Sequence, residues 1–274
     1  SDVYANKILV CLQRYVFPYI GDTNIAKIET FHLAEVIRNI DNKGVHDVAI
    51  RTRQYLTKIM RYAIQKGIIY YNPAFDLEGV IPPANTRHYP ALPLNHLPAL
   101  LTNIDNYNGK ELTRLALKLN IHVFLRASEL QFARWSEFDF KMRIWTIPAE
   151  REAIPGVRFS ERGSKMKEEH LVPLSDQVME LLTCIKHISK ESEFVLPGIR
   201  DKHKPMSENT INKALRTLGY NTKLDVCAHG FRTMACSALN ESEKWSKDAI
   251  ERQMSHKDRN TVRAAYMHKA EFLE

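Results

Sequence analysis

A proline-rich stretch divides this chain of 274 residues into two parts. Residues 79–93, with the sequence GVIPPANTRHYPALP, contain four prolines in fifteen positions and show neither helical nor strand periodicity. Proline fixes φ and has no backbone N–H, so such a stretch cannot continue a regular element and indicates a connector. We therefore predict a helical domain over residues 1–80, a linker over 81–93, and a larger domain over 94–274.

The first part has apolar residues at helical spacing, which predicts three helices over residues 3–19, 28–40 and 47–66. Pro18 and Gly21 are expected to end the first of them. About 80 residues is near the lower size at which a domain holds a core alone.

The third predicted helix has a basic polar side that carries Arg51, Arg53, Lys58 and Arg61. Two interpretations are open for this side. It either contacts nucleic acid or is an ordinary solvated face, and the helix alone favours the solvated face.

The second part predicts a mainly α domain with a small antiparallel three-stranded sheet. We expect helices over residues 94–104, 110–122, 175–186, 207–218, 228–239, 245–254 and 261–268, and strands over 143–148, 170–173 and 194–196. Residues 149–169 are charged and interrupted by glycine, so we expect a hairpin-like excursion that is too polar for the core and carries Lys165 and Lys167.

Charge favours a polyanionic partner, since 39 Lys and Arg against 32 Asp and Glu give a net charge of 39 − 32 = +7. No segment has the roughly 18 to 20 unbroken apolar residues of a membrane span, so we expect a soluble protein. The four cysteines include no CxxC pair, which favours reduced thiols. Cys227, His229 and Cys236 lack a fourth metal ligand at a recognisable spacing, so no metal site is expected.

Residues 229–266 contain the side chains that chemistry on a phosphate requires. Arg232 offers a planar fork of permanent donors, His229 and His256 can move protons near neutral pH, and Tyr266 carries an ionisable oxygen nucleophile. Taken singly, each of these residues is more often structural than catalytic.

Arg126 lies beside apolar residues where we expect the helix over 110–122 to be followed by a further short helix, and an arginine in such a junction needs a partner. Glu129, three residues later, can reach it from the second of these helices.

Five signals in a fixed order resemble the tyrosine recombinase (phage integrase) family. They are Arg126 in LRASEL, Lys165 ahead of HLVPLS, His229 and Arg232 in HGFRT, His256 in SHKDRN, and Tyr266 ten residues later. The segments WSEFDF and WTIPAE are similar to those of integrases from satellite prophages and pathogenicity islands. The resemblance covers both predicted domains.

The resemblance implies a DNA-cleaving and rejoining enzyme in which Tyr266 attacks a phosphodiester and forms a 3′-phosphotyrosyl link. Arg126 and Arg232 would neutralise the charge on the phosphate oxygens. Lys165 would protonate the leaving 5′ oxygen. Because the excursion before HLVPLS is longer than in many relatives, Lys167 remains the alternative for that role.

Further roles follow from the same resemblance. His229 would act as general acid or base, and His256 would donate a hydrogen bond to the phosphate. Glu129 would hold Arg126 or His229 in place. The resemblance implies no cofactor, metal or ATP, because the covalent link conserves the energy of the phosphodiester.

The expected partner is a double-stranded DNA attachment site, gripped as a clamp by both domains, with Arg51, Arg53, Lys58 and Arg61 in contact with it. The resemblance implies a tetramer on DNA, DNA-bending accessory proteins, and a place in the bacterial cytoplasm at the nucleoid. It also implies an N-terminal arm-binding domain and a longer C-terminal segment, so we expect a trimmed fragment, for which a monomer stays open beside the tetramer. Two alternatives stay open: a type IB topoisomerase that relaxes DNA, and a DNA-binding regulator with a silent site.

Overall fold

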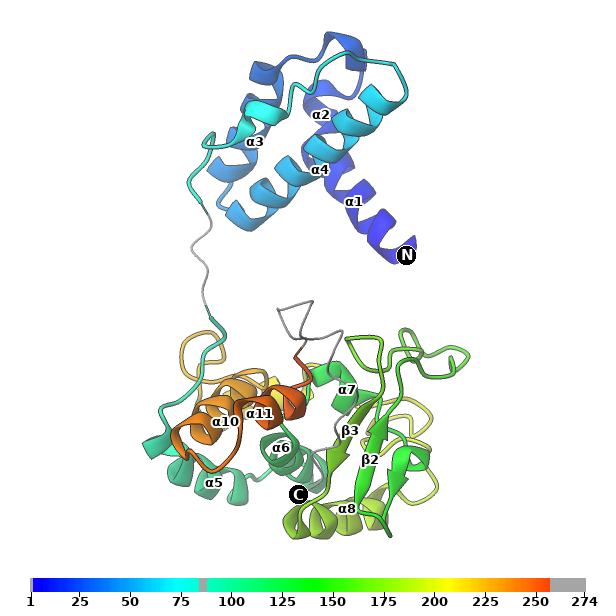
Figure 1. Cartoon of the computed structure of the whole chain (residues 1–274), viewed down its shortest axis with the longest axis vertical. Coiled ribbons are helices and arrows are strands. Elements are labelled where there is room, and N and C mark those ends of the chain that lie inside the picture. Colours follow the sequence, from blue (N-terminus) through cyan, green and yellow to red (C-terminus); the bar gives the residue numbers. More distant parts are fainter. Residues whose placement is uncertain (1, 84–87, 257–274) are drawn as a thin grey trace. The chain divides into compact units, whose positions relative to one another are not determined.

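The computed structural model describes residues 2–83 and 88–256. The chain forms two compact units, residues 1–87 and 88–274, and each is described by itself (Figure 1). The division falls within the proline-rich stretch from which two domains were predicted.

The first unit is helical. Its elements are α1 (Asp2–Tyr15), α2 (Phe17–Ile20), a 3₁₀ turn (Ile25–Lys27), α3 (Thr30–Asn42), α4 (His46–Gln65) and a second 3₁₀ turn (Phe75–Leu77). Pro18 does not end the first helical stretch as predicted, because it lies in the first turn of α2. Backbone N–H groups in a first turn have no acceptor within the helix, so proline loses no hydrogen bond there. The core joins the apolar faces of α3 and α4, with Leu33, Ile37 and Met60 almost fully buried.

The second unit combines helices with one small sheet. Its elements are a 3₁₀ turn (Leu94–His96), α5 (Leu97–Asp105), α6 (Glu111–Val123), α7 (Ala127–Gln131), a 3₁₀ turn (Trp135–Glu137), β1 (Phe138–Asp139), β2 (Ile144–Ile147), β3 (His170–Pro173), α8 (Asp176–Ser189), α9 (Thr210–Thr217), α10 (Gly230–Glu241) and α11 (Lys247–Gln253). The mainly α fold class with a three-stranded antiparallel sheet is confirmed. The helix predicted over 261–268 lies outside the described residues.

One strand of the sheet was predicted at the wrong place. The sheet order is β1-β2-β3, with Phe138 opposite Trp145 and Ile147 opposite His170. Residues 194–196 are not a strand of this sheet, because Phe194 forms only an isolated bridge with Arg134. That run is apolar because all three of its side chains are buried in the core, which gives the same pattern as a strand.

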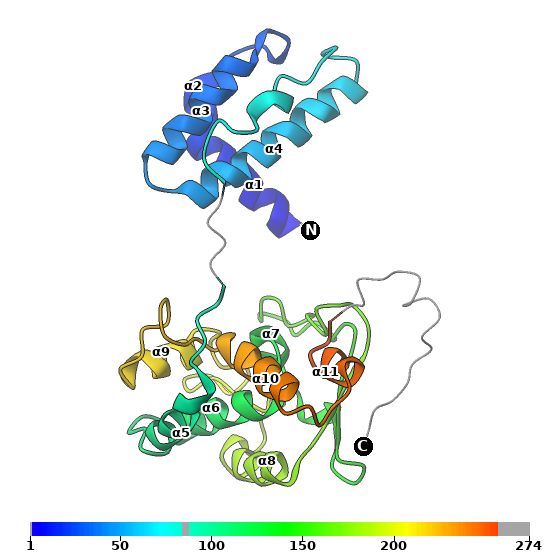
Figure 2. The ribbon, with the colours of Figure 1, turned by 60° about the vertical axis from the view of Figure 1, so that its left-hand side comes forward.

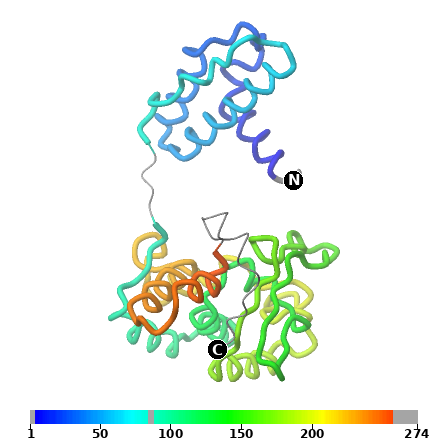
Figure 3. The backbone as a smooth tube through the Cα atoms, viewed as in Figure 1, coloured from blue at the N-terminus to red at the C-terminus, as the bar shows by residue number. Residues whose placement is uncertain are grey.

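Helix α6 lies at the centre of the second unit and contacts α5, α8, α9 and α10 (Figure 2). Its buried residues lie on more than one side, from Leu112 to Val123. The trace in Figure 3 runs from α6 through α7 into the sheet, and Arg126 lies in the short connection between the two helices. None of the helices in the described ranges has the length and apolar character to cross a membrane.

Candidate active site

Arg126 and Glu129 form a buried pair at the start of α7. Arg126 is the residue before the helix, and its backbone N–H donates to Glu129 Oε2 at 3.0 Å. Its Nη1 donates to Glu129 Oε1 at 3.0 Å, with the arginine side chain 13% exposed and the glutamate fully buried. The predicted ion pair is therefore present. Of the two residues that Glu129 was predicted to hold, Arg126 and His229, it binds Arg126, and no bond joins it to His229 in the described part of the chain.

Arg232, in the first turn of α10, is 5% exposed and makes its bonds to main-chain carbonyls. Nη1 donates to the carbonyl oxygen of Phe124, and Nη2 donates to that of Met254 at 2.6 Å. Phe124 ends α6 with φ of 55°, a left-handed conformation that is uncommon for a bulky residue and marks a constrained turn.

The two arginines converge on the same segment. Arg126 Nη2 donates to the carbonyl of Ser255 at 2.8 Å, and Arg232 donates to the preceding carbonyl, that of Met254. Residues from α6–α7, α10 and the end of α11 are thus brought together, although 129 positions separate Arg126 from Ser255.

His229 immediately precedes α10 and packs against Tyr89, with ring centroids 4.2 Å apart. The next residue must be glycine, because a Cβ on Gly230 would lie 2.0 Å from the carbonyl oxygen of Pro90. Residues 89–90, at the end of the proline-rich stretch, therefore fix the position of His229.

His256 is the last described residue and lies beside Arg232. Its Nδ1 is 2.8 Å from Glu251 Oε2, and its Nε2 is 3.5 Å from Arg232 Nη2. These contacts fit the tautomer in which Nδ1–H donates to the carboxylate and Nε2 faces the guanidinium. Tyr266 lies outside the described residues.

Lys165 and Lys167 are both exposed but make different contacts. The backbone N–H of Lys165 donates to Glu129 Oε1 at 3.1 Å, which ties this part of the loop to the Arg126 pair. Lys167 Nζ instead donates to Glu150 Oε1 at 2.6 Å, within an exposed ion pair.

Electrostatics favours an anion at this site. Burial opposes ionisation of Glu129, but hydrogen bonds from the Lys165 and Arg126 amides and the Arg126 charge outweigh it, so the pKa of Glu129 lies below its ordinary value. Burial, followed by the Arg126 charge, lowers the pKa of Arg232 to about 10, so Arg232 stays charged at neutral pH.

Burial also lowers the pKa of His229, and the charges of Arg232, Arg126 and Lys165 lower it further. His229 is therefore neutral at pH 7 and able to accept a proton. Three cations, Arg232, Arg126 and Lys165, act on His229, and the carboxylate of Glu129 is paired with one of them, Arg126.

Sequence reasoning missed two buried polar residues near this site. His170 on β3 is 5% exposed, and its pKa is lowered by burial. Arg151, in the excursion that was predicted to be too polar for the core, is 6% exposed and pairs with Glu137. The prediction was wrong here because a charged residue is normally exposed, and only long-range contacts reveal that it is buried.

The candidate DNA-contacting residues of the first unit do not share one face. Arg51, Lys58 and Arg61 are exposed and lie within about 80° of each other around α4 at 3.6 residues per turn. Arg53 is half-buried on another side, with Nη1 3.4 Å from the carbonyl oxygen of Leu77.

No group of three or more potential metal-binding residues occurs in residues 2–83 and 88–256. Cys227 is buried and Cys236 half-buried, and both are free thiols.

Comparison with known families gives two matches that together span most of the chain. The profile of the Phage integrase family matches residues 90–271, and that of the Phage integrase central domain matches residues 1–80. Two similar relatives are the putative protein IntB of Escherichia coli (strain K12) and the integrase of Enterobacteria phage P4, each 53% identical over 274 residues. The whole chain is covered in both cases, and it spans 69% and 62% of the length of these relatives.

Solved structures share the fold at low sequence identity. A lambda integrase dimer bound to a COC′ core site has a TM-score of 0.69 at 17% identity, over 98% of this chain and 91% of that one. The Tn1549 transposon integrase in complex with transposon right end DNA has a TM-score of 0.77 at 16% identity, over 99% of this chain and 90% of that one.

Proposed function

The chain belongs to the phage integrase family, and from this membership we propose that it is a site-specific DNA recombinase that integrates or excises a mobile element. One observation carries the proposal beyond the family: Arg126 and Arg232, from distant parts of the sequence, bind adjacent carbonyls at the end of α11 beside a neutral histidine. Such a cluster suits a phosphodiester, whose non-bridging oxygens gain charge when the phosphorus becomes five-coordinate.

Cleavage in this proposal begins with Tyr266. Its oxygen bonds to phosphorus, the bond from phosphorus to the 5′ oxygen breaks, and a 3′-phosphotyrosyl link and a free 5′-hydroxyl result. His229, neutral at pH 7, accepts the tyrosine proton. The ten residue steps from His256 to Tyr266 reach at most about 33 to 36 Å, which is ample for a tyrosine that acts beside Arg232.

The phosphate would be held by Arg126 and Arg232, and His256 would donate a further hydrogen bond from Nε2 in its doubly protonated form, with Nδ1–H held by Glu251. Glu129 keeps Arg126 oriented through two hydrogen bonds and does not touch the phosphate. Arg232 is charged at neutral pH, and its hydrogen bonds to the carbonyls of Phe124 and Met254 fix its orientation before DNA binds.

We assign the protonation of the 5′ oxygen to Lys165. Its charge acts on His229 and its amide is bound to Glu129, whereas the Lys167 ammonium is engaged by Glu150. Lys165→Ala should therefore slow cleavage by about 10² or more, the usual size of a general-acid effect. Lys167→Ala serves as the matched control and should stay close to wild type.

The proposed partner is double-stranded DNA. In the first unit, we keep Arg51, Lys58 and Arg61 as phosphate contacts, because they share an exposed side of α4. Arg53 is reassigned to an internal role, since it binds the carbonyl of Leu77. Each lost phosphate contact should reduce the slope of log affinity against log salt by about 0.9, and Arg53→Ala should leave the slope unchanged.

We propose that four copies act together on DNA. A lambda integrase tetramer bound to a Holliday junction shares the fold, with a TM-score of 0.69 at 18% identity. Accessory DNA-bending proteins and action at the bacterial nucleoid are part of the same proposal.

A nicked suicide substrate that carries a candidate attachment site tests the function. Cleavage next to the nick releases a short fragment that carries the free 5′-hydroxyl, so religation fails and a covalent protein–DNA adduct accumulates. We expect the adduct with the wild-type chain and none with Tyr266→Phe. An adduct that persists in Tyr266→Phe would assign the nucleophile to another residue, and relaxation of a supercoiled plasmid without exchange between two sites would favour a topoisomerase.

A further inference from the structure

The loop of residues 149–169 encloses a buried arginine at the end of the sheet. The Arg151 side chain is 1% exposed and that of Glu137 is 7% exposed. Arg151 Nε donates to Glu137 Oε1 at 2.5 Å and Nη2 donates to Oε2 at 2.8 Å, so the two planar groups meet through two parallel bonds.

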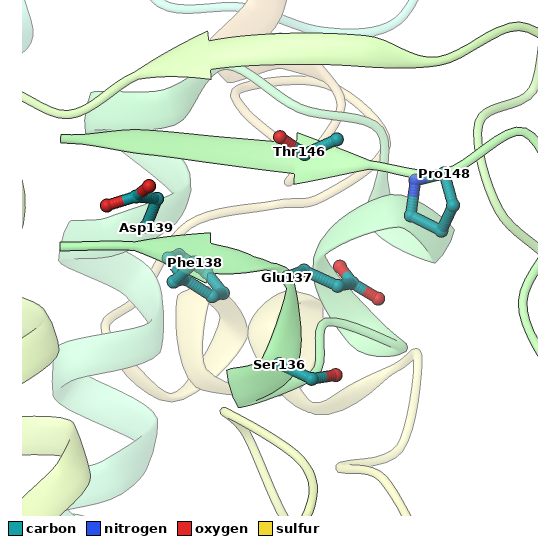
Figure 4. Close-up of a pocket in the computed structure, with 6 residues that line it drawn as sticks. All are labelled: Ser136, Glu137, Phe138, Asp139, Thr146 and Pro148. Carbon is teal, nitrogen blue, oxygen red and sulfur yellow. The ribbon is translucent and has the colours of Figure 1, made fainter. Parts of the chain in front are cut away.

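Glu137 is itself fixed to the sheet. Trp145 Nε1, in the middle of β2, donates to Glu137 Oε2 at 2.9 Å. Figure 4 shows Glu137 before β1 and Pro148 after β2 at the same end of these strands, where the loop begins.

The remaining donors of Arg151 bind the loop and the active site. Nη1 donates to the carbonyl of Arg162 at 2.6 Å, three residues before Lys165. Nη2 also lies 3.3 Å from the carbonyl oxygen of Glu129, the residue whose carboxylate accepts the Lys165 amide. One guanidinium thus joins both anchor points between which Lys165 is held.

The backbone just before Lys165 is closely packed. The Ser164 N–H donates to the carbonyl of Pro148 at 2.8 Å. A Cβ on Gly163 would lie 2.1 Å from the same oxygen, so this approach requires glycine. The loop therefore returns to the end of β2 directly ahead of the lysine.

Stability alone does not account for this arrangement. Burying an ion pair costs desolvation energy, and well-packed apolar residues of similar volume are often as stable or more so. Apolar residues, however, cannot bind the carbonyls of Arg162 and Glu129. The specific effect of Arg151 is the position it imposes on the loop.

We propose that Arg151 is a positioning residue for Lys165: through Arg162 and Glu129 it holds the lysine where it can protonate the leaving 5′ oxygen. The inference rests on the proposed function, in which Lys165 is the general acid. Arg151 itself is buried and does not touch DNA or the reacting atoms.

The test compares two suicide substrates that differ in one atom, the bridging 5′ oxygen or a 5′ sulfur. A thiolate leaves without needing a proton, so loss of the acid slows cleavage of the oxygen substrate only. The variant is Arg151→Met with Glu137→Gln, which leaves neither charge buried alone, alongside Arg151→Lys. We expect cleavage to slow by about 10² on the oxygen substrate and by less than about 3-fold on the sulfur substrate.

Matched variants separate the possible results. Lys165→Ala should give the same pattern, and adding it to the Arg151 variant should slow the oxygen reaction no further. Arg143→Met is the control, because Arg143 and its partner Asp176 are 56% and 78% exposed and lie outside the loop. It should cleave both substrates at the wild-type rate.

Failure of the inference differs from failure of the proposed function. If the wild-type chain forms no adduct with either substrate, the proposed function is wrong. If it forms both adducts and the Arg151 variant slows them equally, Arg151 supports the fold or the phosphate clamp, and the positioning role is refuted.

A measurement without DNA provides a second arm. Hydrogen exchange of the Lys165 amide should accelerate in the variant, while the amides of α6 keep their protection. Unchanged exchange at Lys165 would contradict the role.

Discussion

Replacing Glu129 by glutamine removes a negative charge from a fully buried side chain while keeping its shape. The carboxylate accepts three hydrogen bonds: from Arg126 Nη1 and the Lys165 amide on Oε1, and from the Arg126 amide on Oε2. A glutamine has only one acceptor oxygen, so it cannot replace all three.

The loss can be worked out for the better of the two glutamine orientations. With the amide oxygen at the place of Oε1, two bonds remain and the NH₂ group faces the Arg126 N–H. Leaving that buried N–H without an acceptor costs about 1–3 kcal/mol. The bond from Arg126 Nη1 loses its charge assistance, about 1 kcal/mol more. The expected loss of unfolding free energy is about 2–4 kcal/mol. This is slightly less than the roughly 3–5 kcal/mol that removing one partner of a buried ion pair costs, since glutamine keeps two of the three hydrogen bonds.

Urea unfolding followed by tryptophan fluorescence measures this loss of unfolding free energy for the second structural unit, which contains Glu129. All three tryptophans, Trp135, Trp145 and Trp245, belong to the second unit, so the signal does not report the first. Glu111→Gln is the control, because its ion pair with Arg114 is 3.4 Å long and the glutamate is 62% exposed. That variant should lose less than about 1 kcal/mol.

A pH series gives the result that would refute the reasoning. Because the pKa of Glu129 is lowered in the folded state, its stabilisation is complete above the ordinary value of 4.5 and is lost as the pH falls through the lowered value. The difference between wild type and Glu129→Gln should therefore shrink below pH 4.5. A difference under about 1 kcal/mol at pH 7, or one that grows in acid, would show that the carboxylate does not hold this junction.

Three further predictions concern the same unit. Burial lowers the pKa of His170, so acid protonates this histidine more readily in the unfolded chain and destabilises the folded one. His170→Met should therefore reduce the loss of stability between pH 7 and pH 5, which urea midpoints at both pH values measure. Lys165→Ala should raise the pKa of His229, since the lysine charge lowers it; an NMR titration measures the shift. Gly163→Ala should cost about 1–3 kcal/mol in urea unfolding, because its Cβ meets the Pro148 carbonyl at 2.1 Å.

Local relations could be predicted from the sequence. Arg126 and Glu129 are three residues apart, and that spacing alone brings the two side chains together at the start of a helix. The proline-rich stretch, which restricts the backbone covalently, contains the division between the two units. Most helices followed from apolar periodicity, as with α4 and α6.

Relations across the chain could not be predicted in this way. Nothing local in WTIPAER indicates that Arg151 turns inward, because its partner Glu137 lies fourteen positions earlier. Likewise, β1 has only two residues, too few for a periodic pattern, whereas residues 194–196 are apolar for a different reason. In both cases the deciding contacts are tertiary.

Three arginines in the described part of the second unit are more deeply buried than Arg126, namely Arg134, Arg151 and Arg232, and they differ in their partners. Arg151 is paired with Glu137 and Arg134 with Glu193, and both also bind carbonyls of the loop of residues 149–169. Arg232 forms no ion pair within the described ranges, and its donors rest on the carbonyls of Phe124 and Met254. A carbonyl carries only a partial charge, so the full charge of Arg232 is not neutralised by its own fold. A buried cation of this kind is costly to fold and most effective when an anion arrives, which is why we place the phosphate against Arg232 and assign Arg151 to the scaffold.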